Sequence, residues 1–209
     1  MSEVNDPPKR KRLSYEDRRS EFVQKAIEFF AEEGFDSSTR ELARRLGVTQ
    51  PLLYRYFPSK EDLIAEVYET VYVRRWSAAW DRMIADRSVP IRERLIAFYD
   101  VYTDVVFQRD WMRIFLFAGL KGGDINRRYI DRVRDRILEP IIREWRAEEG
   151  LPVDDVTDKE VELAWAVHGG IYYYGVRTEI YGQAPMAGLP FVIECSIDSL
   201  ISGLEKLQD

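Results

Sequence analysis

The sequence predicts an all-α protein made of a three-helix N-terminal head and a larger helical bundle. Apolar residues recur every three or four positions along most of the 209 residues, and no stretch alternates as a β-strand does. Glycine and proline are sparse and fall mainly between these periodic runs. The apolar content of 45% is enough for a buried core, and the charged content of 33% is typical of helices with solvated faces.

The composition also indicates the compartment. The single cysteine, Cys195, cannot form an internal disulfide, which favours a reducing environment. No apolar run approaches the roughly 18 residues of a membrane helix, and the N-terminus lacks the apolar core of a secretory signal. We therefore expect a cytoplasmic protein with no membrane partner.

The chain begins with a polar stretch, residues 1–13, that holds the basic run 9–12. We expect a flexible basic arm, which either contacts nucleic acid phosphates or serves as a solvated tail. From Ser14 to Glu33 the apolar stripe Phe22, Ala26 and Phe30 predicts the first helix of the head.

The next stretch, Ser38 to Lys60, predicts two short helices joined by a tight turn. Ser38 and Glu41 have the spacing of a capping box, and Gly47 can take the left-handed conformation that ends a helix. Thr49 can cap the second helix, in whose first turn Pro51 is tolerated. Two helices around a short glycine-containing turn match the helix-turn-helix, whose second helix enters the DNA major groove.

Charge is distributed unevenly. Residues 1–65 hold equal numbers of basic and acidic residues, so the net charge of −6 falls entirely on the remainder. The stretch from Thr39 to Lys60 contains five basic residues and only one acidic residue, Glu41. Basic charge concentrated on this motif and on the N-terminal arm, together with an acidic body, is typical of a protein that binds DNA at one end.

The remaining periodic runs predict the body. A fourth helix should run from Ser59 to about Ala85 without a break, so that it belongs to both head and body. Further helices are expected over 93–109, 110–118, 126–149 with a kink at Pro140, 159–182 and 189–207. The domains are then an arm (1–13), a helix-turn-helix domain (14–65) and a body (66–209).

The head resembles the tetracycline-repressor (TetR) family of bacterial regulators. The resemblance covers roughly residues 15–65 and is carried by four motifs, Thr39-Arg40-Glu41-Leu42-Ala43, Leu46-Gly47-Val48, Gln50-Pro51-x-Leu53-Tyr54-x-Tyr56-Phe57 and Ser59-Lys60-Glu61-x-Leu63. It implies a body that binds a small-molecule effector and forms a homodimer through the last two helices. The first of these two helices contains Gly169, Gly170 and Gly175, each of which weakens a helix by roughly 1 kcal/mol. A close approach of another helix at these positions would compensate for that cost.

Ten residues of the motif are predicted to contact DNA. Arg40 either pairs with a guanine edge or binds phosphate, Gln50 can pair with adenine, and Leu52 can touch a thymine methyl. Phosphate contacts are more typical of the hydroxyl-bearing residues and of Lys60 at a helix start. The full set is Thr39, Arg40, Thr49, Gln50, Pro51, Leu52, Tyr54, Arg55, Tyr56 and Lys60.

The body is rich in aromatic residues, most of which we expect to be packing residues. Together they suggest an apolar pocket for an effector of unknown identity, lined by Tyr102, Trp111, Phe115, Trp165, His168 and Tyr172. His168 is the only histidine and has no partners for a metal site. No cofactor motif, phosphate-binding loop or catalytic constellation is found, so we expect no enzyme activity.

These observations predict a dimeric transcriptional regulator, most simply a repressor released from a two-fold operator in double-stranded DNA by a small molecule. Two alternatives remain open at this point. One is an activator or effector-independent regulator with the same head, and the other is a helical ligand carrier or enzyme whose head is vestigial.

Overall fold

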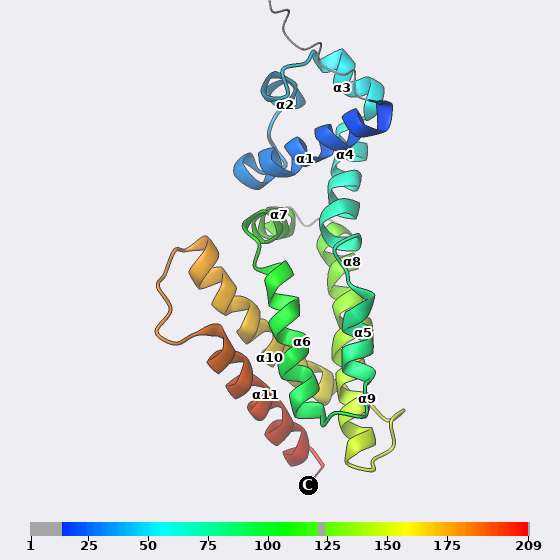
Figure 1. The fold of residues 1–209 in the computed structure, drawn as a ribbon, viewed down its shortest axis with the longest axis vertical. Helices are drawn as coiled ribbons and strands as arrows, with labels where there is room; N and C mark the ends of the chain where they lie inside the picture. The colour runs from blue at the N-terminus through cyan, green and yellow to red at the C-terminus, as the bar shows by residue number, and fades with distance from the viewer. Residues whose placement is uncertain (1–13, 121–123, 209) are drawn as a thin grey trace, which may run out of the picture.

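A computed structural model describes residues 14–120 and 124–208, with the side chains of 124 and 125 excepted. The expected arm, residues 1–13, lies outside this range. The head forms one end of the elongated molecule (Figure 1). Its helices are α1 (Tyr15–Glu33), α2 (Thr39–Arg45), α3 (Gln50–Tyr56) and the start of α4 (Lys60–Tyr68). Its core is formed by the predicted stripe of α1 and by the inner faces of α2 and α3, namely Phe22, Ala26, Phe30, Leu42, Ala43, Leu53 and Phe57.

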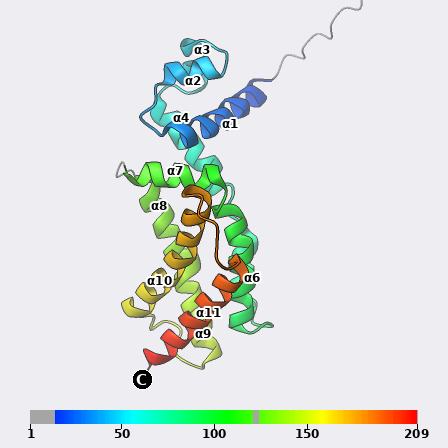
Figure 2. The same ribbon diagram turned by 90° about the vertical axis from the view of Figure 1, so that its left-hand side faces the viewer.

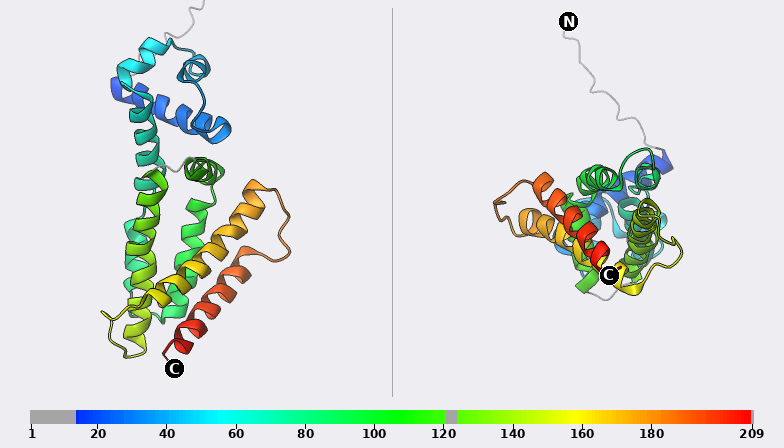
Figure 3. Two further views of the ribbon diagram at one scale, coloured as in Figure 1. Left: turned by 180° about the vertical axis from the view of Figure 1, so that it is seen from behind. Right: turned by 90° about the horizontal axis from the view of Figure 1, so that it is seen from below.

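The body is a helical bundle behind the head. Its elements are the π-helical continuation of α4 (Glu69–Val73), α5 (Ala78–Ala85), α6 (Ile91–Val106), α7 (Arg109–Leu120), α8 (Asp124–Val133), a π-helical segment (Arg134–Leu138), α9 (Glu139–Glu148), α10 (Asp158–Gly175), its π-helical end (Val176–Ile180) and α11 (Leu189–Lys206). Helices α8 and α9 form one column beside α5, and α10 and α11 form the opposite side (Figure 1; Figure 3, left). Within the described ranges there is no strand, so the all-α class is confirmed.

Helix α7 lies across the bundle and contacts the head (Figure 2). The guanidinium of Arg113 donates to the carbonyls of Ala31 and Glu32, the second at 3.3 Å, so it occupies acceptors that α1 leaves free at its C-terminus. The ring of Phe117 lies against Gly34, where an added Cβ would come within 3.2 Å of it. The head is therefore seated on the body through α7 as well as through α4.

The predicted unbroken helix from Ser59 to Ala85 is wrong in its second half. The first half does pass from head to body, since Val71 and Tyr72 are buried in the body core. After the wide π-helical turn at Glu69–Val73, however, the chain leaves the helix at 74–77. Ser77 accepts a hydrogen bond from the Ala79 amide at 3.2 Å and starts a new helix.

In place of the predicted kink at Pro140, the helix contains a π-helical segment that ends at Leu138, two residues before the proline. Proline lacks an amide hydrogen and its ring crowds the preceding turn, so the backbone widens there. No helix in the described residues is both long and apolar enough to cross a membrane.

Candidate functional site

The turn between α2 and α3 is set by short-range chemistry. Gly47 has φ +66°, a conformation that favours glycine, and it ends α2. The Thr49 hydroxyl accepts from the Leu52 amide at 3.4 Å and caps α3. Ser38 caps α2, but through the Arg40 amide, and Glu41 binds Arg44 instead. The expected capping box at Ser38 is therefore absent, whereas the Ser59–Asp62 box at the start of α4 is complete.

Three predicted DNA-contacting side chains form a hydrogen-bonded group on the outer face of α2 and α3. The Thr39 hydroxyl lies 3.0 Å from the Tyr54 hydroxyl, and the Gln50 amide nitrogen donates to Thr39 at 3.0 Å. These contacts join the start of α2 to the recognition helix and hold Gln50 in place. Helices α2 and α3, which carry these residues, lie at the end of the molecule away from the body (Figure 1).

The basic residues of the motif divide into paired and unpaired groups. Arg44 binds Glu41 at 2.6 Å, and Arg45 binds Glu32 and Glu33 of α1, both at 2.5 Å. The Arg44 guanidinium accordingly holds the pKa of Glu41 below its usual value. Arg40, Arg55 and Lys60, by contrast, have no ion pair with any described residue. Arg40, Arg55 and Lys60 are thus the cations of this stretch that remain available to bind phosphate.

The remaining predicted contacts differ in exposure. Thr49 and Pro51 are exposed at the start of α3. Leu52, expected to touch a thymine methyl, is half-buried. Tyr56 does not point outward: its ring stacks on Tyr15 at 4.5 Å and meets Phe22 edge-on at 5.0 Å. The sequence could not show this, because the stacking partner comes from α1.

The six residues predicted to line an effector pocket belong to one aromatic network. Trp111 stacks on Phe115 at 5.2 Å, both rings face Tyr172, and His168 lies between Trp165 and Tyr102. The two groups are joined by Tyr129, which the sequence analysis missed. Its hydroxyl is 2.9 Å from that of Tyr102, and its ring lies 5.1 Å from Trp111.

His168 is a buried, uncharged member of this network. Its Nδ1 lies 3.2 Å from the Tyr99 hydroxyl, and its side chain is almost fully enclosed. Burial lowers the pKa of His168 to about 4, so the imidazole is neutral at pH 7. In the described part of the chain there is no cluster of residues suited to a metal ion.

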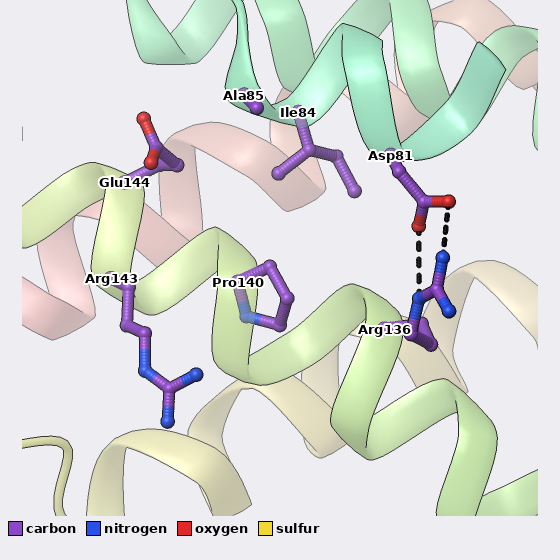
Figure 4. Close-up of a pocket in the computed structure, with 7 residues that line it drawn as sticks. All are labelled: Asp81, Ile84, Ala85, Arg136, Pro140, Arg143 and Glu144. Carbon is purple, nitrogen blue, oxygen red and sulfur yellow. Dashed lines mark hydrogen bonds and ion pairs between the residues drawn. The ribbon is translucent and has the colours of Figure 1, made fainter. Parts of the chain in front are cut away.

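A separate surface groove of about 280 Å³ lies between α5 and α9 (Figure 4). Charged residues line it, but each has a partner. Arg136 binds Asp81 at 2.5 Å, Arg143 binds Glu139 at 3.0 Å, and Glu144 binds Arg87 at 2.8 Å. The groove therefore offers a ligand no unmatched charge.

The glycines of α10 differ in their surroundings. A Cβ at Gly175 would come within 2.5 Å of the Phe107 ring, so that glycine is required by packing inside the chain. At Gly169 and Gly170 an added Cβ meets nothing within 4 Å. They lie on the outer side of α10, and the adjoining region exposes Tyr173, Tyr181, Met186 and Phe191.

Solved structures share this architecture. A TetR-like regulator from Rhodococcus sp. RHA1 matches with a TM-score of 0.69 and 20% identity, covering 92% of this chain and all of that chain. A TetR-family regulator from Mesorhizobium loti MAFF303099 matches with a TM-score of 0.65 and 14% identity, covering 91% and 98% of the two chains. At these identities the likeness concerns the fold.

Sequence similarity is more specific. Residues 22–67 match the model of the bacterial regulatory proteins of the tetR family. The nucleoid occlusion factor SlmA of Marinomonas sp. (strain MWYL1) is 30% identical over 178 residues, which cover 78% of this chain and 85% of the relative. The chain thus belongs to the TetR family of DNA-binding transcriptional regulators, which are not enzymes.

Proposed function

We propose that this regulator is a repressor that binds a two-fold symmetric operator as a homodimer and is released by a small-molecule effector. Residues 14–65 would bind DNA, and residues 66–209 would bind the effector and dimerise, with the arm 1–13 beside the DNA. A protein with this task acts in the cytoplasm. The observation that carries the proposal is that helices α2 and α3 carry both a hydrogen-bonded Gln50 and two exposed arginines, Arg40 and Arg55, without an ion pair to any described residue.

For DNA binding, the free cations and the ordered polar group have different roles. Arg40 and Arg55 supply charge that the phosphates require, and Gln50, held by Thr39, supplies an amide for a base edge. Genomic fragments selected by the protein should contain a two-fold sequence, since a two-fold dimer matches two half-sites. The double variant Arg40→Ala, Tyr54→Ala should lose binding to these fragments, and unchanged affinity would contradict the assigned face.

For dimerisation, the outer sides of α10 and α11 are the proposed interface. Open space over Gly169 and Gly170 and four exposed apolar side chains nearby favour contact with a second copy. Gly169→Glu tests this directly, because the substitution is accommodated within one chain. We expect a folded monomer by analytical ultracentrifugation, while Gly150→Asn, at a positive φ in the loop between α9 and α10, should leave the dimer intact.

For release, the contact between α7 and the head is the proposed route. Arg113 and Phe117 hold the end of α1, and Trp111 and Phe115 on the same helix belong to the aromatic network. An effector that binds a displaced α7 more tightly would shift the spacing of the two heads. Titration of the operator complex with candidate ligands tests this, and no ligand-dependent release would favour an effector-independent regulator.

A second candidate follows from the relative, which is named a nucleoid occlusion factor. One observation favours it, namely that the similarity extends through 85% of that protein rather than the head alone. Deletion of the gene discriminates between the two. Altered transcripts next to the selected DNA sites support the repressor, whereas division across unsegregated nucleoids without such changes supports nucleoid occlusion.

A further inference from the structure

Four tyrosines from four separate elements meet in the centre of the body. We call Tyr72, Tyr102, Tyr129 and Tyr172 the tyrosine cluster; they come from the π-helical continuation of α4, from α6, from α8 and from α10. Tyr102 and Tyr129 hydrogen bond to each other, and Tyr72 donates to the Trp111 carbonyl at 3.1 Å. Burial raises the pKa of these three hydroxyls, and the nearby Tyr172 hydroxyl adds to the rise in each.

The fourth hydroxyl has no partner. The Tyr172 hydroxyl oxygen is buried without a hydrogen bond to any described residue, and so is the indole nitrogen of Trp76, whose ring lies 6.3 Å from Tyr129. A buried polar group left unpaired costs about 1–3 kcal/mol, so two of them around one aromatic network require an explanation. Trp76 can only donate, which means that the missing partner is an acceptor.

The charges next to the cluster are already paired. Arg75 and Asp110, which both affect the pKa of Tyr72, bind each other at 2.7 Å. The fully buried charged side chains in the described ranges are engaged elsewhere: Arg146 with Glu160 at 2.9 Å, and Arg94 with Glu144 at 3.1 Å. At the rim, Arg132 lies over the Trp76 ring at 5.4 Å. A charged ligand among the tyrosines would lose its hydration without meeting an unpaired opposite charge among them.

The network also reaches the surface. Trp76, Phe115 and Tyr172 are only half-buried, although the two unpaired polar atoms are covered. These three rings therefore connect the cluster to the surface. Trp111 and Phe115 would stack on a flat molecule that entered there.

We propose that the tyrosine cluster is the effector site and that the effector is an uncharged, largely aromatic molecule with a carbonyl or ether oxygen. The oxygen accepts a hydrogen bond from the Tyr172 hydroxyl, and the rings of α7 cover the apolar part. This inference rests on the proposal that the body binds an effector, but not on how that effector changes DNA binding.

The proposed ligand chemistry can be tested on the full chain with four small monosubstituted benzenes that differ in charge and in hydrogen-bond acceptors. They are acetophenone, benzoate, benzylammonium and ethylbenzene. Binding is followed by fluorine NMR of 5-fluorotryptophan protein, with the Trp76 and Trp111 resonances assigned by Trp→Phe variants. We expect acetophenone to shift both resonances saturably, and the two charged probes to bind at least tenfold more weakly. Ethylbenzene, which lacks the acceptor, should bind about three- to tenfold more weakly.

Tyr172→Phe should abolish the preference for acetophenone over ethylbenzene, since it removes a hydroxyl without breaking an existing hydrogen bond. Tyr173→Phe is the matched control, because Tyr173 is 54% exposed on the same helix. Benzoate binding as tightly as acetophenone would overturn the proposal and point to Arg132. Absence of any saturable shift would overturn it as well, by showing that the cluster is ordinary core. Operator binding is measured separately on the same samples. It tests whether the protein is a repressor, whatever the ligand-binding result.

Discussion

At the tip of the head, Arg40, Arg55 and Lys60 carry charge that no described residue neutralises, whereas the charged side chains fully buried in the body are all ion-paired. Around the tyrosine cluster the unpaired polar atoms are different in kind: the Tyr172 hydroxyl and the Trp76 indole are buried and uncharged. The surface of the head lacks anions to pair with its cations, whereas the cluster lacks partners for two neutral groups.

This difference shows how one small chain can serve two unlike ligands. Phosphates are strongly hydrated and are best bound by exposed, flexible cations, which also attract DNA from a distance. An apolar effector is best bound where water is excluded and no charge must be desolvated.

The largest effect is expected at the buried ion pair of the body. Arg146 holds Glu160 with two hydrogen bonds of 2.9 and 3.0 Å, and Glu160 is fully buried. Arg146→Met leaves that carboxylate unpaired and should reduce the free energy of unfolding by about 3–5 kcal/mol, measured by urea denaturation.

Two variants control this measurement. Arg143→Met on the same helix breaks an exposed pair with Glu139 and should cost less than about 1 kcal/mol. Adding Glu160→Gln to Arg146→Met removes the stranded charge while a capping side chain for Thr157 remains, so part of the loss should return. If the two single variants lost equal stability, the body would not depend on pairing its buried charges.

The next effect concerns pH. The folded-state pKa of His168, about 4, is below the value of 6.5 for an exposed histidine, so the unfolded chain binds the extra proton first as pH falls. The stability due to neutral His168 is fully present above pH 6.5 and is lost as pH falls toward 4, by up to about 3 kcal/mol. His168→Gln should flatten the dependence of unfolding free energy on pH in that window. An unchanged slope would mean that the imidazole accepts a proton in the folded body.

The head was largely predictable because its signals are local. Gly47 and Thr49 act within three residues, and each works as the spacing indicates. What the sequence could not show is the pairing of Arg45 with Glu32 and Glu33, since α1 meets α2 only in three dimensions. The division of the arginines into free and paired groups is therefore a tertiary property.

The body was predictable in its helices but not in its centre. Tyr129 lies in the arginine-rich stretch 127–132, which is typical of a solvated face, yet its ring is buried among those of α7. The end of the fourth helix was missed for a related reason. Ser77 is a cap signal, but the apolar periodicity continues past it, and the Trp76–Trp80 contact at 5.3 Å spans the break. Periodicity identifies a buried face without revealing where the backbone changes direction.

A smaller effect on stability is expected to distinguish tyrosines whose hydroxyl is hydrogen-bonded from those whose hydroxyl is not. Tyr102→Phe leaves the Tyr129 hydroxyl without its partner and should cost about 1–3 kcal/mol. Tyr172→Phe deletes a hydroxyl that has no partner and should leave the unfolding free energy unchanged or slightly raised. Thermal denaturation of both variants without ligand measures this difference. Equal losses would show that the Tyr172 hydroxyl is hydrogen-bonded in solution.

The smallest effect distinguishes the arginines of the head. Arg55→Ala should weaken binding to any duplex by on the order of 1 kcal/mol, about fivefold, and lower the salt slope of the affinity by about one, because one phosphate contact is lost. Arg44→Ala removes a cation that Glu41 already neutralises and should change neither quantity measurably. Fluorescence anisotropy over a salt series measures both. An equal change of slope in the two variants would mean that phosphate displaces Glu41 from Arg44, and the contrast between head and body would then reduce to the total charge of each.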